Sequence, residues 1–129
     1  MDVWGNIAIS GSGDINIYFT RGGTLVNTVD FITPINAPVW HATWPCKVIK
    51  IKGYRVGGNA TTAINARKNG SSNHLATAKT LASASTWIDA GTVQNTDYAV
   101  GDSLEIMVTT AGDSLTQIAV QVDFIKLLT

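Results

Sequence analysis

The chain of 129 residues has few of the side chains that most protein chemistry uses. It contains one cysteine, Cys46, one glutamate, Glu105, and two histidines, His41 and His74. A single cysteine excludes an intramolecular disulfide, and a zinc site would need several ligands from elsewhere. One glutamate and scattered aspartates give no sequence signal for the converging carboxyl pair of acid–base catalysis. We therefore expect no enzymatic activity, no cofactor and no metal.

Charge of either sign is also scarce. Only 14% of the residues are charged, and nine basic residues balance nine acidic ones, so the net charge is +0. No basic surface large enough to attract nucleic acid is expected from this balance. Low net charge favours self-association instead, so we expect protein partners that include further copies of this chain.

Long apolar runs are missing as well. No run approaches the ~18 apolar residues of a membrane span. The start of the chain, Met1–Asn6, lacks the basic and apolar regions of a signal peptide. We expect no membrane partner and synthesis in the cytoplasm of the producing cell. If the protein works outside that cell, it leaves by lysis or inside an assembled particle.

What the chain does contain is a series of short alternating apolar segments separated by turn residues. Eight such segments at regular spacing predict one all-β domain, a jelly-roll-like antiparallel β-sandwich. At this length there is no room for two cores. The predicted strands are 28–33, 38–44, 47–56, 61–68, 75–81, 87–93, 104–110 and 115–127.

Two turns support this assignment, and one segment is ambiguous. Asn69-Gly70 is a strong hairpin signal because a type I′ turn needs positive φ at both central residues. Ala111–Ser114 is a second turn between strand-like runs. Residues 75–82 also fit a helical stripe, but the preceding Asn-Gly turn favours a strand. Three aspartates in turns, Asp97, Asp102 and Asp113, leave a loop calcium site as a minor alternative.

The segment 47–56 is predicted to carry its basic residues on an exposed strand. Ile49 and Ile51 alternate with lysines, and Gly53 then breaks the alternation, which predicts a bulge at Gly53. Lysines on an exposed strand usually prevent edge-to-edge pairing. Such a role is expected for the basic group, which comprises Lys47, Lys50, Lys52 and Arg55.

Residues 1–26 differ from the rest of the chain. Glycine- and serine-rich stretches at 10–13 and 21–23 separate two short strand-like runs at 7–9 and 15–19. A lone two-stranded unit is marginally stable. We therefore expect residues 1–26 to form an N-terminal arm or hairpin that becomes ordered against a partner, and residues 27–129 to form the sandwich.

Four tryptophans are many for this length, and Trp87 is predicted to lie in the core. Alternation places Trp40 and Trp44 on one face of a segment bounded by Pro38 and Pro45, prolines that favour an edge strand or a turn. Three roles stay open for the pair: a subunit-interface anchor, a sugar-stacking platform, or a lid on the sandwich. Both histidines are expected at a surface or interface. The candidate partner or oligomer contacts are Trp4, Ile15, Ile17, Tyr18, Phe19, Trp40, His41 and Trp44.

The run from Ile51 to Leu127 resembles a jelly-roll module of tailed-bacteriophage structural proteins, most of all capsid decoration (cement) proteins. The resemblance lies in turn and core residues: Tyr54-Arg55-Val56, Lys68-Asn69-Gly70, Trp87–Val93, Tyr98–Ile106 with its Gly101-Asp102 step, and Val108–Gly112.

This resemblance implies a fold and a role. Modules of this kind are trimeric and non-enzymatic, and they bind the major capsid protein at the head surface, where they stabilise the capsid by bridging its subunits. The implied location is the virion capsid surface. The alternative is a tail-tip, fibre or carbohydrate-binding module for host attachment. Partner choice is expected to lie in residues 1–26 and 39–45, outside the resemblance.

Overall fold

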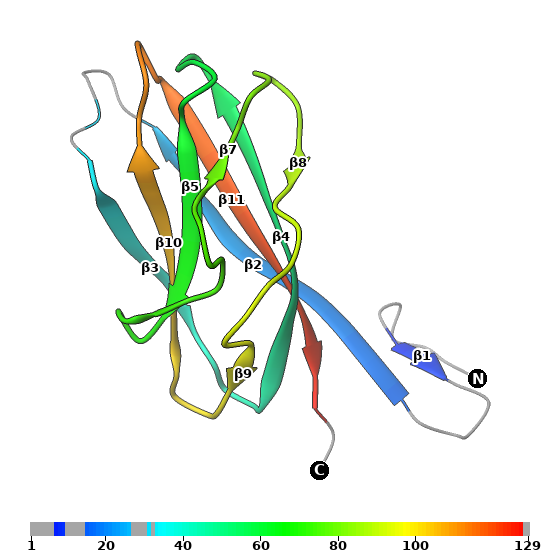
Figure 1. The fold of residues 1–129 in the computed structure, drawn as a ribbon. Helices are drawn as coiled ribbons and strands as arrows, with labels where there is room; N and C mark the ends of the chain where they lie inside the picture. Colours follow the sequence, from blue (N-terminus) through cyan, green and yellow to red (C-terminus); the bar gives the residue numbers. More distant parts are fainter. Residues whose placement is uncertain (1–6, 10–14, 27–30, 32, 128–129) are drawn as a thin grey trace.

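The computed structural model of the protein describes residues 7–9, 15–26, 31 and 33–127. Trp4 and most of the predicted strand 28–33 lie outside these residues. Two antiparallel sheets pack face to face, as predicted for a β-sandwich (Figure 1). The described residues contain no helix, and so none that could cross a membrane.

Each sheet has three long strands and two or three short ones. The first sheet has the order β1 (Ile7–Ile9), β2 (Ile15–Val26), β11 (Gln117–Lys126), β4 (Cys46–Val56), β8 (Ile88–Asp89), with β9 (Asp97–Tyr98) also on β4. The second sheet has the order β3 (Ile35–His41), β10 (Ser103–Thr110), β5 (Ala63–Lys68), β6 (Ser72–Asn73), with β7 (Lys79–Thr80) also on β5.

The strands pair in a nested order. β2 pairs with β11, β3 with β10, β4 with β8 and β9, and β5 with β6 and β7. Successive long strands therefore alternate between the two sheets, as when one antiparallel ribbon is rolled up on itself. This is the jelly-roll arrangement.

The two predicted turns serve different purposes. Asn69 and Gly70 have φ of 55° and 72°, and the Ser71 N–H donates to the Lys68 carbonyl, so the hairpin between β5 and β6 is confirmed. The turn at 111–114 instead joins strands of different sheets. Gly112 and Ser114 take positive φ there, at 73° and 54°.

The core lies between the inward faces of the two sheets. Aliphatic residues from β4, β5, β10 and β11 dominate it, and Phe124 and Tyr98 add aromatic bulk. Its largest fully buried side chains are Tyr98, Phe124, Ile51, Ile64, Leu75, Leu81, Leu104, Ile106, Ile118, His74, Val48 and Val108.

The alternation within β4 differs from the predicted one. Asp123 of β11 lies opposite Lys50, but the next residue, Phe124, lies opposite Val48. Ile49 therefore has no partner residue on β11 and is the extra residue of a bulge. The bulge therefore lies at Ile49, which is exposed, and not at Gly53. Ile51, Gly53 and Arg55 all face inward. A Cβ at Gly53 would lie 2.9 Å from the Leu81 side chain and 3.1 Å from that of Ile64, so a larger residue there would require these side chains to shift.

Arg55 is buried, which corrects the predicted exposed basic group. Its guanidinium donates to the carbonyl oxygens of Leu81, Ala82 (2.9 Å) and Gly57 (2.7 Å). These bonds hold residues 81–82 as irregular backbone, so the predicted strand 75–81 is reduced to the short β7. The basic group does not protect an edge either, because β4 lies between β11 and β8–β9. Its three lysines pair with Asp97, Asp89 and Asp123, respectively.

The segment predicted as an arm contributes a full strand to the sandwich. β2 pairs with β11 from Ile17, opposite Lys126, to Val26, opposite Gln117. A boundary at residue 26 therefore separates β2 from the sheet to which it belongs, since β2 pairs with β11 along ten residues. β1 pairs with the first residues of β2, and this hairpin extends away from the sandwich (Figure 1).

Gly22 is the position where the pairing of β2 with β11 tolerates no side chain. A Cβ at Gly22 would overlap the carbonyl oxygen of Val120, whereas a Cβ at Gly23 would meet only side-chain atoms, of Val39 at 3.2 Å and of Ile106 at 3.5 Å. We expect Gly22→Ala to lower the free energy of unfolding by about 2 kcal/mol or more, as overpacking does. The matched control Gly23→Ala should cost clearly less, measured by urea unfolding. Equal losses for the two variants would contradict this account of β2.

Candidate functional site

Aromatic side chains gather inside one end of the sandwich. Phe19 stacks on Phe124 with ring centroids 5.0 Å apart and 5° between the ring planes. Trp40 and Trp44 contact Phe19 edge-on, at 5.6 and 5.7 Å. Tyr98 packs edge-on against Phe124 at 5.2 Å. The structure thus brings together three of the predicted contact residues, Phe19, Trp40 and Trp44. All three are half-buried, in the position of a lid on the sandwich.

The other predicted contact residues are spread apart. Ile17 is half-buried, Tyr18 is exposed on the opposite face of β2, and His41 is exposed at the end of β3. Ile15 begins β2, and its side chain lies outside the described part, as does the whole of Trp4. Trp87, predicted to lie in the core, is 45% exposed and packs against Tyr54 with ring centroids 5.1 Å apart.

Among the described residues, the strands and loops cover the apolar core less completely on one side of the sandwich than on the other. Beyond Ile17, β2 pairs only with β11, and β3 pairs only with β10, among the described residues. We call this side the β2–β3 seam. It is lined by inward-facing side chains that remain partly exposed: Phe19, Arg21, Leu25, Ile35, Ala37 and Val39.

On the opposite side, the short strands β7, β8 and β9 and their loops cover the core (Figure 1). The inward-facing side chains there, such as Val48, Ile51 and Ile64, are at most 1% exposed. Within the part of the chain that the structure describes, the apolar interior is thus less covered at the seam than on the opposite side.

Cations lie over the aromatic rings at the seam. The Arg21 guanidinium is 5.0 Å from the Phe19 ring centroid and 5.4 Å from that of Trp40. The Lys126 ammonium lies 4.8 Å from the Trp44 ring. Such contacts stabilise a partly exposed aromatic cluster. Sequence reasoning missed Arg21, because Arg21-Gly22-Gly23 looks like a flexible turn and is in fact the middle of β2.

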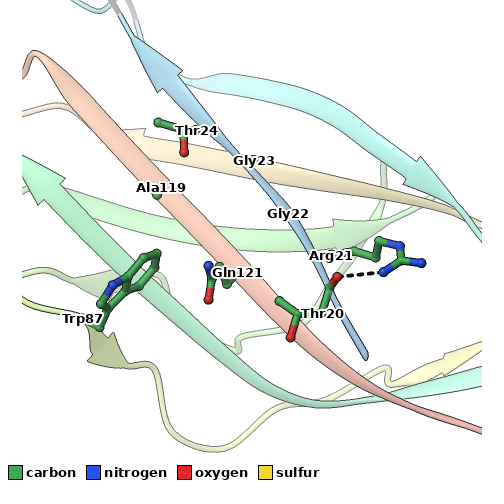
Figure 2. Close-up of a pocket in the computed structure, with 8 residues that line it drawn as sticks. All are labelled: Thr20, Arg21, Gly22, Gly23, Thr24, Trp87, Ala119 and Gln121. Carbon is green, nitrogen blue, oxygen red and sulfur yellow. Dashed lines mark hydrogen bonds between the residues drawn. The ribbon is translucent and has the colours of Figure 1, made fainter. Parts of the chain in front are cut away.

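A shallow groove crosses the outer face of the first sheet. One hollow of about 290 Å³ lies between β2, β11 and the Trp87 indole (Figure 2). A second, of about 380 Å³, adjoins it at Thr20 and reaches Ile49 and Asp123. We call the two together the outer groove. Its side chains come from alternate positions of the strands: Tyr18, Thr20, Thr24, Ile49, Lys52, Trp87, Ala119, Gln121 and Asp123.

His74 is buried, against the prediction of a surface or interface histidine. Its Nδ1 lies 3.1 Å from the Gln94 carbonyl oxygen, which can only accept, so Nδ1 carries the proton. The Tyr98 hydroxyl then donates to Nε2 at 2.7 Å. Burial lowers the pKa of His74 and raises the pKa of Tyr98. This neutral pair joins the loop after β6 to β9 inside the core.

The side chains that could carry chemistry do not converge. Cys46 is fully buried, and desolvation raises its pKa to about 11, so little reactive thiolate exists at neutral pH. Glu105 accepts a hydrogen bond from Arg67 at 2.9 Å. Asp102 accepts from the backbone of Ala99 and the amide of Asn69. Among the described residues, no group of three possible metal ligands forms, so the calcium alternative gains no support.

Comparison with known proteins identified no relative. Neither the protein-family models, nor the curated proteins, nor the solved structures contain a match to this chain.

The buried His74 predicts acid sensitivity. Its pKa is lower in the folded protein than in the unfolded chain, so the unfolded state binds more protons as the pH falls below about 6.5. Stability should be full above that pH and decline toward pH 5.5. We expect His74→Gln to flatten this decline in urea unfolding measured between pH 7.5 and 5.5. The control His41→Gln changes an exposed histidine and should decline like the wild type. An unchanged slope in His74→Gln would contradict the assignment.

Proposed function

We propose that the protein is a structural virion protein of a tailed phage. In this proposal it is a homotrimeric capsid decoration protein that stabilises the head by bridging major capsid subunits. The resemblance of Ile51–Leu127 to that class supports the proposal, and the strand order of the structure is compatible with it. The observation that carries the assembly part is the β2–β3 seam.

The seam has the properties of a subunit contact. It combines two strand edges that have no partner strand over most of their length among the described residues with partly exposed apolar side chains, and both features favour association. Three copies with their seams facing a common axis would each place the β2 side against the β3 side of the next copy. Such a contact is heterologous and closes after three subunits. It would complete the cover that the core lacks on this side.

The β1–β2 hairpin suits a second contact, with the capsid. It extends beyond the sandwich (Figure 1), and a two-stranded unit of this size gains stability from pairing with another sheet. Strand addition supplies backbone hydrogen bonds without special side-chain chemistry. Three hairpins on one trimer would act together, because each bound hairpin raises the effective concentration of the others.

The absence of converging chemistry among the described residues fits a mechanical role. Cys46 and His74 are both fully buried, and Glu105 is engaged by Arg67. The proposed activity accordingly consists of binding and bridging, with no catalytic step.

The location in the particle tests the proposal most directly. We expect immunogold electron microscopy of the parent virion, with antibody against this chain, to place gold over the whole head surface. Preimmune serum is the control. Gold confined to the tail end would overturn the decoration role in favour of host attachment, and unlabelled particles would overturn the virion assignment.

The oligomeric state in solution tests whether the β2–β3 seam is the contact between subunits. We expect the wild-type protein to sediment as a trimer. Ala37→Arg places a charge among the inward-facing side chains at the seam and should shift the sedimenting mass toward the monomer. Its matched control is Asn36→Arg on the same strand, which faces outward and should leave the trimer intact. A monomeric wild type, or dissociation by both variants alike, would show that the seam is not the contact.

A further inference from the structure

We propose that the outer groove binds a neutral saccharide, with the Trp87 indole as the surface on which a sugar ring stacks. This inference does not rest on the decoration role, because it concerns the opposite face of β2 from the seam. It concerns Trp87, which is a different residue from the Trp40–Trp44 pair that the sequence suggested as a sugar platform.

The Trp87 indole is exposed to solvent, and the Tyr54 ring packs against it and fixes its position. Its side chain is 45% exposed, and the Tyr54 ring lies behind it with an interplanar angle of 46°. A supported indole presents a fixed apolar face at little entropic cost. The C–H face of a sugar ring is apolar and flat, so it packs on such a surface, while its hydroxyl groups remain free for hydrogen bonds.

The floor of the groove is kept low by small residues. Ala119 on β11 lies between the Trp87 indole and Thr24, and Gly22 lies on β2 between Thr20 and Thr24 (Figure 2). At Gly22 no side chain fits, because a Cβ would overlap the Val120 carbonyl oxygen. The backbone pairing of β2 with β11 therefore holds this part of the groove open.

Polar groups that suit hydroxyl ligands point into the groove. The Gln121 side chain lies between Trp87 and Thr20 on the same face of the sheet (Figure 2). Its amide offers both donors and an acceptor, as neighbouring sugar hydroxyls require. No side-chain hydrogen bond within the described part of the chain engages Gln121 or Thr24, so both can bind a ligand.

The charge of the groove favours a neutral ligand. Lys52 and Asp123 pair at 3.5 Å, and the Thr20 hydroxyl donates to the same carboxylate at 2.6 Å. The Arg21 side chain leaves β2 on the other face (Figure 2). No unpaired cation of the described lining is thus available for a phosphate or a sialic acid. Because two hollows adjoin at Thr20, the groove suits a chain of sugar units better than a single ring.

The test uses the full-length protein and a glycan array that carries neutral glucans, mannans and galactans beside sialylated and phosphorylated glycans. We expect binding to neutral glycans only. For the best neutral oligosaccharide, isothermal titration should show affinity weakened at least about tenfold by Trp87→Ala, with partial retention in Trp87→Phe. Gln121→Ala should also weaken binding.

The control Val100→Ala removes an exposed apolar side chain outside the groove and should bind like the wild type. Urea midpoints of all variants establish that each is folded. Three results would overturn the proposal: no binding to any neutral glycan at millimolar concentration, binding that survives Trp87→Ala unchanged, or preference for the acidic glycans.

Discussion

The pairing of β2 with β11 is the contact on which the rest of the structure depends. It joins ten residue pairs from opposite ends of the chain and closes the rolled ribbon. It also makes β2 the outer long strand of the first sheet, with side chains that alternate between the two faces. The odd-numbered residues from Phe19 to Leu25 point inward and line the seam, whereas the even-numbered ones from Tyr18 to Thr24 line the groove. Both candidate surfaces are therefore consequences of where this one strand lies.

Sequence reasoning succeeds where the signal is local. The Asn69-Gly70 turn, the long strands β4, β5, β10 and β11, and the sandwich itself follow from turn chemistry and alternation. It fails for the position of the bulge within β4, because which residue is extra depends on partners that are distant in the sequence. Leu81 and Ile64 occupy the space above Gly53, and the carbonyls of residues 81 and 82 draw Arg55 inward. No pattern within 47–56 contains that information.

The candidate surfaces were predictable only in part. Phe19, Trp40 and Trp44 were among the residues predicted as contacts, and the structure shows that they form one aromatic cluster, while their role in a contact stays a prediction. Arg21 was missed because Arg-Gly-Gly is locally a turn signal, and the ladder with β11 overrides it. Trp87 was predicted to lie in the core, but it is 45% exposed. Its exposure depends on how the irregular segment before β8 runs across the sheet, and this is set by tertiary contacts such as those of Arg55.

The two proposals are physically compatible because they use opposite faces of the same strand. A second copy that covers the seam contacts the inward-facing side chains and the strand edge of β2, and it leaves the outward-facing threonines and Gln121 open. Assembly would then multiply the groove without blocking it. A shallow groove with one stacking residue binds a saccharide weakly on its own, since it buries little of the ligand. Three grooves on one trimer, and many trimers on one particle, would convert that weak affinity into firm attachment to a surface that repeats the same sugar.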